Sequence, residues 1–265
     1  MDRLAHRQRV FTALSLLLLL GLSVGLGGWV LFAAVLAAGL VALAEFYHMI
    51  WPTSRMGAKI LGLVLGALLL WICRVQSLAG LALILVGSFW LLAFLVLYGF
   101  NEDQGASWPD LLGLPVGLLY IPLTLQFFFT FSSQETVLVL LAAITSDTAA
   151  FYAGSWLGGR KLWPEVSPKK TWAGLSGGLL GTMAVTTAYG LFFGQSGPWA
   201  LAGLGLVLGL GAVLGDLFES ALKRRFASKD SGCLLPGHGG MLDRIDGLLL
   251  ATALYALIRL FHPFF

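Results

Sequence analysis

The sequence predicts an all-α protein: a polytopic helical integral membrane protein with about nine transmembrane helices and a cytoplasmic N-terminus. Hydrophobic residues make up 58% of the 265 residues, and charged residues only 11%. The mean hydropathy is +0.88, and several apolar runs are long enough to cross a hydrocarbon layer of about 30 Å. These runs are continuous, whereas the strands of a membrane β-barrel would alternate apolar and polar residues.

The apolar runs define nine expected helices, at residues 10–26, 29–50, 60–73, 78–100, 111–131, 137–157, 173–193, 199–217 and 248–261. The second run contains Glu45, which we expect near an interface or facing other helices, because a carboxylate facing lipid is costly. Arginines before the first run would also suit a signal peptide, but no clear cleavage site follows that run. The same positive start suits a retained helix.

The distribution of Lys and Arg predicts the orientation, because cytoplasmic loops retain these residues. With a cytoplasmic N-terminus and nine crossings, 14 of the 16 Lys and Arg residues are cytoplasmic, and only Arg74 and Arg259 are not. The polar loops 158–172 and 220–247 then share one face and can meet around one ligand. Such basic residues indicate orientation or anionic ligands better than nucleic-acid binding.

We expect a single membrane domain over residues 1–265. Its N-terminal helices would lie in residues 1–135, and its catalytic helices and cytoplasmic loops in residues 136–265.

The first polar loop contains Ser167, Lys169, Lys170 and Thr171 just before an apolar helix. Ammonium groups and the free N–H groups of a helix N-terminus both favour an anion, so a triphosphate is a plausible ligand. The alternative is a positively charged membrane anchor with a Ser or Thr helix cap.

Two polar features interrupt the apolar runs. Asp147 lies inside the sixth run, where a carboxylate is expensive unless it is paired, hydrated or bound to a cation. A functional role is therefore expected, with a structural lysine partner as the alternative. Asp216, Glu219, Ser220 and Lys223 fall on one helical face if the eighth helix continues through them. That stripe could also be a surface salt-bridge pattern where a helix leaves the bilayer.

Asp243 and Asp246 come directly before the last apolar run and are three residues apart. They can share a helical face and offer the hard oxygen donors that suit Mg²⁺. Gly239 and Gly240 lie just upstream, beside His238, and permit close backbone approach to a ligand. Alternatively, the two carboxylates complement the dipole of the helix N-terminus.

The run from Ser220 to Asp246 resembles the signature of the phosphatidate cytidylyltransferases, the CDP-diacylglycerol synthases. The matching positions, at the family's spacing, are Ser220, Lys223, Arg224, Lys229, Asp230, Pro236, His238, Gly239, Gly240, Asp243, Arg244 and Asp246. SPKKTWAG, residues 167–174, is similar to the family's other motif, SPKKTWEG, with Ala173 where an acidic residue is common. The resemblance covers the N-terminal half only through length and hydropathy.

The resemblance implies transfer of a cytidylyl group from CTP to phosphatidate, which gives CDP-diacylglycerol and pyrophosphate. It also implies Mg²⁺ with a second, monovalent cation, a homodimer surrounded by membrane lipids, and a bacterial inner membrane location with the active site at the cytoplasmic face. Two alternatives remain: another CTP-dependent lipid enzyme resembling a polyprenol kinase, and an anion transporter. A transporter would favour internal repeats, and none is convincing here.

Site residues follow from the same resemblance and from the chemistry of the side chains. Carboxylates would hold the metal, with Asp216 and Asp243 as the principal ligands and Asp246 and Asp147 as further candidates. The nucleotide and phosphate group comprises Ser167, Lys169, Lys170, Thr171, Gly239 and Gly240. The catalytic group comprises Lys223, Arg224 and Arg244, which would hold the phosphatidate headgroup or the leaving pyrophosphate, and His238, as a proton shuttle or a hydrogen-bonding partner of phosphate.

Overall fold

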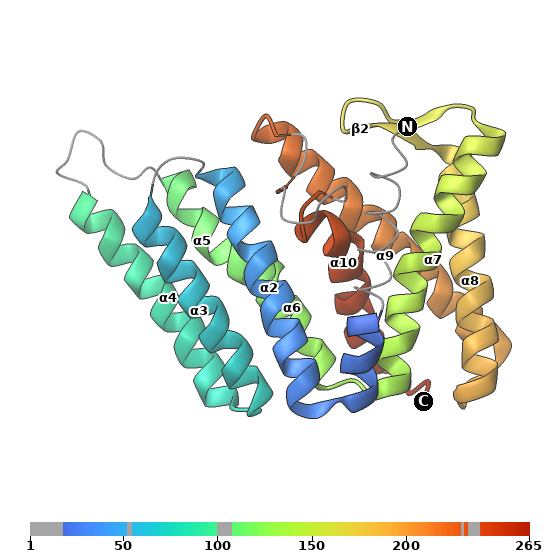
Figure 1. The fold of residues 1–265 in the computed structure, drawn as a ribbon, viewed down its shortest axis with the longest axis horizontal. Coiled ribbons are helices and arrows are strands. Elements are labelled where there is room, and N and C mark those ends of the chain that lie inside the picture. Colours follow the sequence, from blue (N-terminus) through green and yellow to red (C-terminus); the bar gives the residue numbers. More distant parts are fainter. Residues whose placement is uncertain (1–17, 52–54, 100–107, 229–230, 233–238) are drawn as a thin grey trace. The chain divides into compact units, whose positions relative to one another are not determined.

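A computed structural model describes residues 18–51, 55–99, 108–228, 231–232 and 239–265. The chain forms two compact units (Figure 1). Unit 1 comprises Met1–Phe129 and Ser231–Leu242, and unit 2 comprises Thr130–Asp230 and Asp243–Phe265. The expected single domain over residues 1–265 stays a prediction.

The helical membrane architecture is confirmed. In the described part of the chain, six helical segments are long and apolar enough to cross a membrane, namely Gly28–Ile50, Met56–Arg74, Leu112–Phe129, Ser133–Leu157, Trp172–Phe193 and Pro198–Arg225. Residues 18–26 of the first expected span are helical, and residues 10–17 lie outside the described residues. Residues 78–99 and 248–259 of two further expected spans are helical, but neither helix is among the six. Nine crossings therefore stay a prediction.

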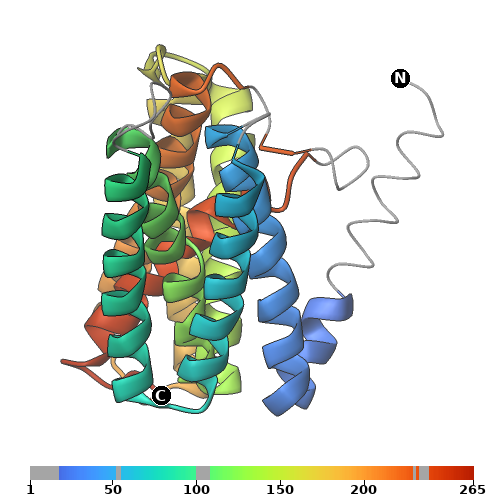
Figure 2. The same ribbon diagram turned by 90° about the vertical axis from the view of Figure 1, so that its left-hand side faces the viewer.

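Unit 1 contains α2 (Gly28–Ile50), α3 (Met56–Arg74), α4 (Leu78–Gly99), α5 (Trp108–Tyr120), α6 (Pro122–Leu125) and the 3₁₀ helix η1 (Gln126–Phe129). Helices α2, α3 and α4 lie side by side (Figures 1 and 2). Their core includes the fully buried Tyr47, whose hydroxyl donates to the carbonyl oxygen of Leu114 at 2.9 Å. A Cβ at Gly62 would lie 2.3 Å from the Tyr47 ring, so this glycine lets α3 approach α2.

The expected helix at 111–131 is interrupted. α5 ends at Tyr120, and α6 begins at Pro122, so that the segment continues as two short helices and η1. Pro122 has no N–H to donate to the preceding turn, and a proline disfavours helical geometry at the residue before it. Proline at the first position of a new helix is well tolerated, which explains where the helix restarts.

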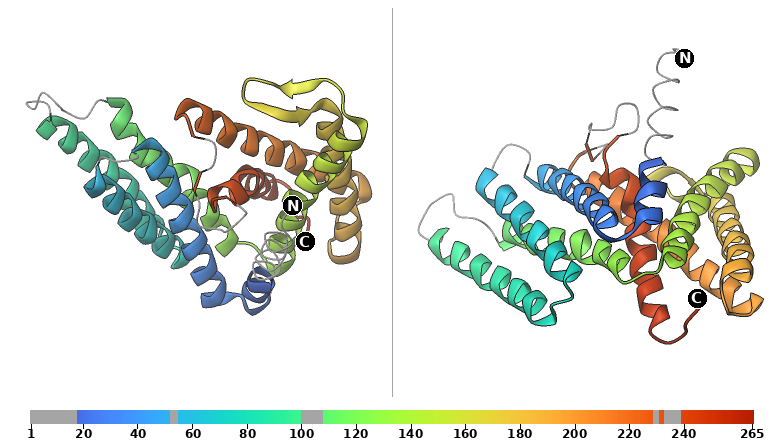
Figure 3. Two further views of the ribbon diagram at one scale, coloured as in Figure 1. Left: turned by 45° about the horizontal axis from the view of Figure 1, so that its top comes forward. Right: turned by 60° about the horizontal axis from the view of Figure 1, so that its bottom comes forward.

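Unit 2 contains α7 (Ser133–Leu157), the strands β1 (Lys161–Trp163) and β2 (Ser167–Thr171), α8 (Trp172–Phe193), α9 (Pro198–Arg225) and most of α10 (Leu242–Arg259). α8 packs against both α7 and α9 (Figure 3). Glycines permit the closest contact, since a Cβ at Gly178 would lie 3.0 Å from the carbonyl oxygen of Ser146.

Three helices in unit 2 begin or end away from the expected positions. α7 begins at Ser133 because Ser132 and Glu135 form a capping box before the apolar run. α9 continues eight residues past Leu217. The helix therefore runs through the whole polar stripe, as the expected common face requires. α10 begins at Leu242 and takes Asp243 and Asp246 into its first turns.

The polar loop before α8 contains an antiparallel hairpin, which the all-α prediction did not include. Lys161 pairs with Thr171, and Trp163 pairs with Ser167 (Figure 3). Thr171 ends β2 and caps α8, because its side chain accepts a hydrogen bond from the N–H of Gly174 at 3.0 Å. The short strand thus gives Ser167, Lys169 and Lys170 fixed positions immediately before the helix.

Candidate active site

A cavity of about 370 Å³ lies within unit 2, between α7, the hairpin, α8 and α9. Five of the predicted residues line it: Asp147 from α7, Lys169, Lys170 and Thr171 from β2, and Asp216 from α9. Most of the other lining residues are apolar, including Phe151 and Leu162. The cavity therefore combines two ammonium groups and two carboxylates with an apolar surface.

An ion pair joins two predicted site residues, Lys170 and Asp216, that are 46 positions apart in the sequence. The Nζ atom of Lys170 lies 2.6 Å from Oδ2 of Asp216, and the hydroxyl of Ser220 donates to Oδ1 of the same carboxylate at 3.2 Å. Lys170 and Asp216 are partly exposed to the cavity, with 23% and 29% of their side-chain surfaces accessible. A ligand in the cavity could therefore reach both side chains and replace one of them in the ion pair.

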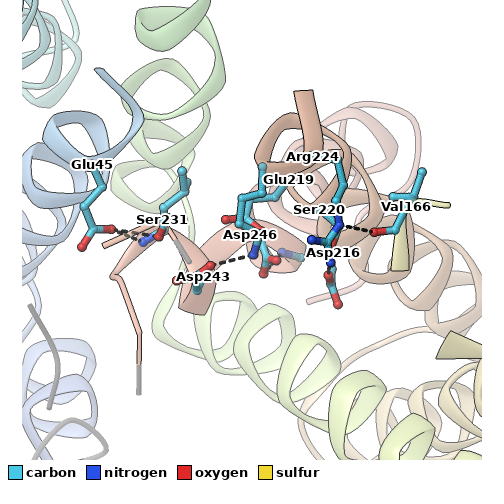
Figure 4. A network of polar contacts seen from close by, with 12 residues as sticks. Glu45, Val166, Asp216, Glu219, Ser220, Arg224, Ser231, Asp243 and Asp246 are labelled. Atoms are coloured by element: carbon cyan, nitrogen blue, oxygen red, sulfur yellow. Dashed lines mark hydrogen bonds and ion pairs between the residues drawn. The ribbon is translucent and has the colours of Figure 1, made fainter. Parts of the chain in front are cut away.

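A second, more deeply buried cluster lies between α9 and α10 (Figure 4). Lys223 forms ion pairs with Glu219, one turn earlier on α9, and with Asp243 on α10, where Nζ and Oδ1 are 2.7 Å apart. Glu219 is completely buried. This burial distinguishes the stripe on α9 from a surface salt-bridge pattern. One lysine thus holds two carboxylates from two helices.

The crossing of α9 and α10 depends on glycines. A Cβ at Gly215 would lie 2.5 Å from the carbonyl oxygen of Asp246, and a Cβ at Gly247 would lie 2.8 Å from the carbonyl oxygen of Ala212. With no side chains in the way, the two backbones touch at the residues that neighbour Asp216 and Asp246. This contact brings the carboxylates of the two helices into one region of unit 2.

Asp246 is the least neutralised of these carboxylates. It is only 7% exposed and accepts the N–H of Gly247 at 2.7 Å. No Lys or Arg among the described residues is paired with it. Burial, followed by the charges of Asp216 and Glu219, raises the pKa of Asp246 well above its usual range. A buried carboxylate beside other carboxylates is a position where a cation would relieve the charge.

The remaining basic residues lie around this region. The Nε atom of Arg224 donates to the carbonyl oxygen of Val166 at 3.4 Å, which ties the end of α9 to the turn of the hairpin. Arg244 is exposed at the start of α10. Asp147 forms no ion pair with any described lysine or arginine, and the alternative of a structural lysine partner is not tested by this.

Three predicted residues are not placed with these groups. His238 lies outside the described residues. Gly239, with a φ of 78°, and the buried Gly240 belong to unit 1 and are described with it. Sequence analysis did not select Glu219 as a site residue, although its spacing of four from Lys223 was visible in the stripe.

The carboxylates have the right chemistry for Mg²⁺, but the described residues do not form a ready metal centre. Their oxygens are the donors that Mg²⁺ prefers, and Asp246 lacks a cationic partner among the described residues. In that same part of the chain, no three His, Cys, Asp or Glu side chains are close enough to form a metal centre. Lysines hold Asp216 and Asp243 instead.

Known proteins similar to this chain point to one family. The sequence matches the cytidylyltransferase family over residues 7–261. It is 40% identical over 157 residues to a protein named phosphatidate cytidylyltransferase from Brucella suis biovar 1 (strain 1330), a match that covers 57% of this chain and 56% of that protein. It is 37% identical over 169 residues to a protein of the same name from Staphylococcus aureus (strain COL), covering 62% of this chain and 65% of the relative.

The chain thus matches little more than half of the length of the Brucella relative. The match to the family is much longer, since it leaves only the first six and the last four residues uncovered. The protein therefore belongs to the cytidylyltransferase family.

Proposed function

We propose that this protein transfers a cytidylyl group from CTP to phosphatidate, which gives CDP-diacylglycerol and pyrophosphate. The observation that carries the proposal is the cavity in which Lys169 and Lys170 meet Asp147 and Asp216. Cations and carboxylates around one cavity suit a reaction between two phosphates. The family and the names of the relatives support cytidine as the nucleoside and phosphatidate as the acceptor.

The reaction needs positioning and charge neutralisation more than covalent catalysis. A phosphate oxygen of phosphatidate attacks the α-phosphorus of CTP and forms a new P–O bond. The bond from the α-phosphorus to the bridging oxygen breaks, and pyrophosphate leaves with that electron pair. A phosphate monoester is already anionic near neutral pH, so no side chain has to remove a proton from it first.

The side chains divide this work. Lys169 and Lys170 would hold the triphosphate, with Ser167, Thr171 and the backbone of Gly239 and Gly240 as further contacts. Lys223, Arg224 and Arg244 would hold the phosphatidate headgroup or the leaving pyrophosphate, and His238 would hydrogen-bond to phosphate or carry a proton. Because Lys223 already bridges Glu219 and Asp243, its ammonium group is held in place before a substrate arrives.

Asp216, Asp243, Asp246 and Asp147 would hold Mg²⁺, with a monovalent cation as a second ion. A bound divalent cation would neutralise charge on the triphosphate oxygens and on the departing pyrophosphate. The proposal includes a homodimer in a bacterial inner membrane, with a cytoplasmic N-terminus and with the cavity at the cytoplasmic face. The bacterial relatives and the distribution of Lys and Arg support this orientation and location.

Product analysis with purified protein in detergent tests the reaction. Each of the four nucleoside triphosphates would be tested separately, with phosphatidate and Mg²⁺ always present. Pyrophosphate and the lipid products would be measured. We expect pyrophosphate and a CDP-lipid with CTP and with none of the other three nucleotides. We expect no product after chelation of divalent cations. CDP and a phosphorylated lipid would instead identify a kinase. Solute flux in proteoliposomes without CTP turnover would identify a transporter.

Asp243→Asn tests the carboxylate that pairs with Lys223. We expect kcat to fall by about 10³-fold or more, because the variant loses charge both for the cation and for holding Lys223. Glu165→Gln is the matched control, because it removes the charge of an exposed carboxylate on the hairpin turn. This variant should keep wild-type turnover. Full activity of Asp243→Asn would remove this residue from the site.

A further inference from the structure

Glu45 in α2 accepts hydrogen bonds from a segment almost 200 positions further along the chain. Its Oε1 atom accepts the N–H of Met241 at 3.0 Å, and its Oε2 atom accepts the N–H of Leu242 at 2.8 Å. The hydroxyl of Ser231 also donates to Oε2, at 3.3 Å (Figure 4). All these residues belong to unit 1. Both oxygens of one buried carboxylate thus hold one stretch of backbone.

Two glycines, Gly232 and Gly240, lie directly against this carboxylate. A Cβ at Gly232 would lie 2.4 Å from Oε1 of Glu45, and a Cβ at Gly240 would lie 2.6 Å from Oε2. Glycine is therefore required on two sides of the same side chain. Glu45 is 8% exposed, and no Lys or Arg among the described residues is paired with it. Backbone N–H groups and one hydroxyl provide its stabilisation instead.

Leu242 is the first residue of α10, so Glu45 caps this helix from another part of the chain. The first N–H groups of a helix have no partner within it, and a negative charge there is favourable. Leu242 is joined directly to Asp243, the carboxylate that pairs with Lys223. The capped end of the helix and the proposed site residue are therefore consecutive in the chain.

We propose that Glu45 is a positioning residue for the cytidylyl transfer proposed above: it fixes the start of α10, and through it the carboxylate of Asp243. Both of its oxygens must be acceptors. Glu45→Gln keeps the size of the side chain but turns an NH₂ group toward a backbone N–H, which disrupts at least one of the two backbone contacts. The proposal rests on the proposed function, because the effect of Glu45 is on that reaction.

Two measurements on the full-length protein in detergent test this role. Hydrogen exchange by mass spectrometry reports the amides of Met241 and Leu242, and steady-state kinetics reports kcat and KM for CTP. For Glu45→Gln we expect both amides to exchange at least about tenfold faster, and kcat to fall about 10-fold to 100-fold with KM for CTP changed less than about threefold. Ser231→Ala removes only one donor and should act in the same direction by about 2-fold to 5-fold, which keeps the test open if Glu45→Gln fails to fold.

Tyr47→Phe is the matched control, since it removes a buried hydrogen bond that joins the same helix to Leu114 in α5. It should leave both the exchange of these amides and kcat unchanged. Unchanged exchange in Glu45→Gln would overturn the anchor. Faster exchange with unchanged kcat, or an equal loss of kcat in Tyr47→Phe, would overturn the positioning role. If the wild-type protein shows no cytidylyl transfer, the proposed function fails, and the exchange rates alone decide the anchor.

Discussion

Two buried carboxylates, Glu45 in unit 1 and Asp246 in unit 2, have nearly equal exposure, at 8% and 7%, but opposite surroundings. Glu45 accepts three hydrogen bonds from N–H and O–H groups. Among the described residues Asp246 accepts one, from Gly247, and it has the carboxylates of Asp216 and Glu219 nearby. Burial alone therefore does not tell what a charged side chain does. The number of donors around it separates a carboxylate that supports structure from one for which we propose a cation.

The largest expected effect comes from neutralising Asp246. We expect Asp246→Asn to lower kcat by about 10³-fold or more, because the site loses a carboxylate for the cation. Without added divalent cations the variant should also be more stable, by about 1–2 kcal/mol, because a buried charge among like charges is removed. Turnover assays and thermal unfolding in detergent measure the two effects.

Glu45→Gln serves as a control for this experiment, because its effect on the melting temperature should be opposite. Glu45→Gln should lower the melting temperature, whereas Asp246→Asn should raise it. If both substitutions destabilise the protein, Asp246 is held by donors as Glu45 is, and the distinction between the two carboxylates fails. An active Asp246→Asn variant would exclude this residue as a metal ligand.

An intermediate effect is expected for Lys170, whose partner Asp216 lies on the cavity wall. Lys170→Ala should raise KM for CTP by about 10-fold to 100-fold and change the KM for phosphatidate much less, because a charge-assisted contact to the triphosphate is lost. Initial rates at varied CTP and fixed phosphatidate measure it. Lys161→Ala, on the neighbouring strand and exposed, should behave as wild type. An unchanged dependence on CTP concentration would contradict the assignment.

The smallest effect is expected for Glu135, a third buried carboxylate and one with many partners. It accepts the hydroxyl of Tyr255 at 2.9 Å, pairs with Arg259 at 2.9 Å and closes the capping box with Ser132. Tyr255→Phe removes one of these donors and should cost about 1 kcal/mol of stability, with kcat and both KM values unchanged. A lower kcat or a higher KM without a loss of stability would show that a carboxylate with many hydrogen-bond donors also serves catalysis. The difference between Glu135 and Asp246 would then no longer separate structural from catalytic roles.

Much of the candidate site was predictable because its chemistry is local in the sequence. Lys169 and Lys170 are adjacent, Asp216 and Lys223 are on one helical face, and Asp243 and Asp246 share the start of one helix. A scarcity of charge in an apolar chain makes such groups visible. The long apolar helices were equally visible, because a span is defined by length and hydropathy.

Other features had no such signal. The contact from Glu45 to Met241 and Leu242 joins a side chain to backbone N–H groups, which every residue except proline carries, so no residue type marks the partner. The pairing of Lys170 with Asp216 depends on the hairpin, whose short polar strands lack an alternating apolar pattern. The interruption at Pro122 was visible as a residue but was outweighed by a continuous apolar run.

The glycine contact between α9 and α10 also limits how this protein can be altered by engineering. Gly211 and Gly215 face the backbone of α10, with added Cβ atoms 3.2 Å from the Cα of Ala251 and 2.5 Å from the carbonyl oxygen of Asp246. Gly203, on the same helix, has no atom within 4 Å of such a Cβ. One helix therefore contains both a position open to stabilising replacement and positions at which any larger residue would push apart two helices of the candidate active site.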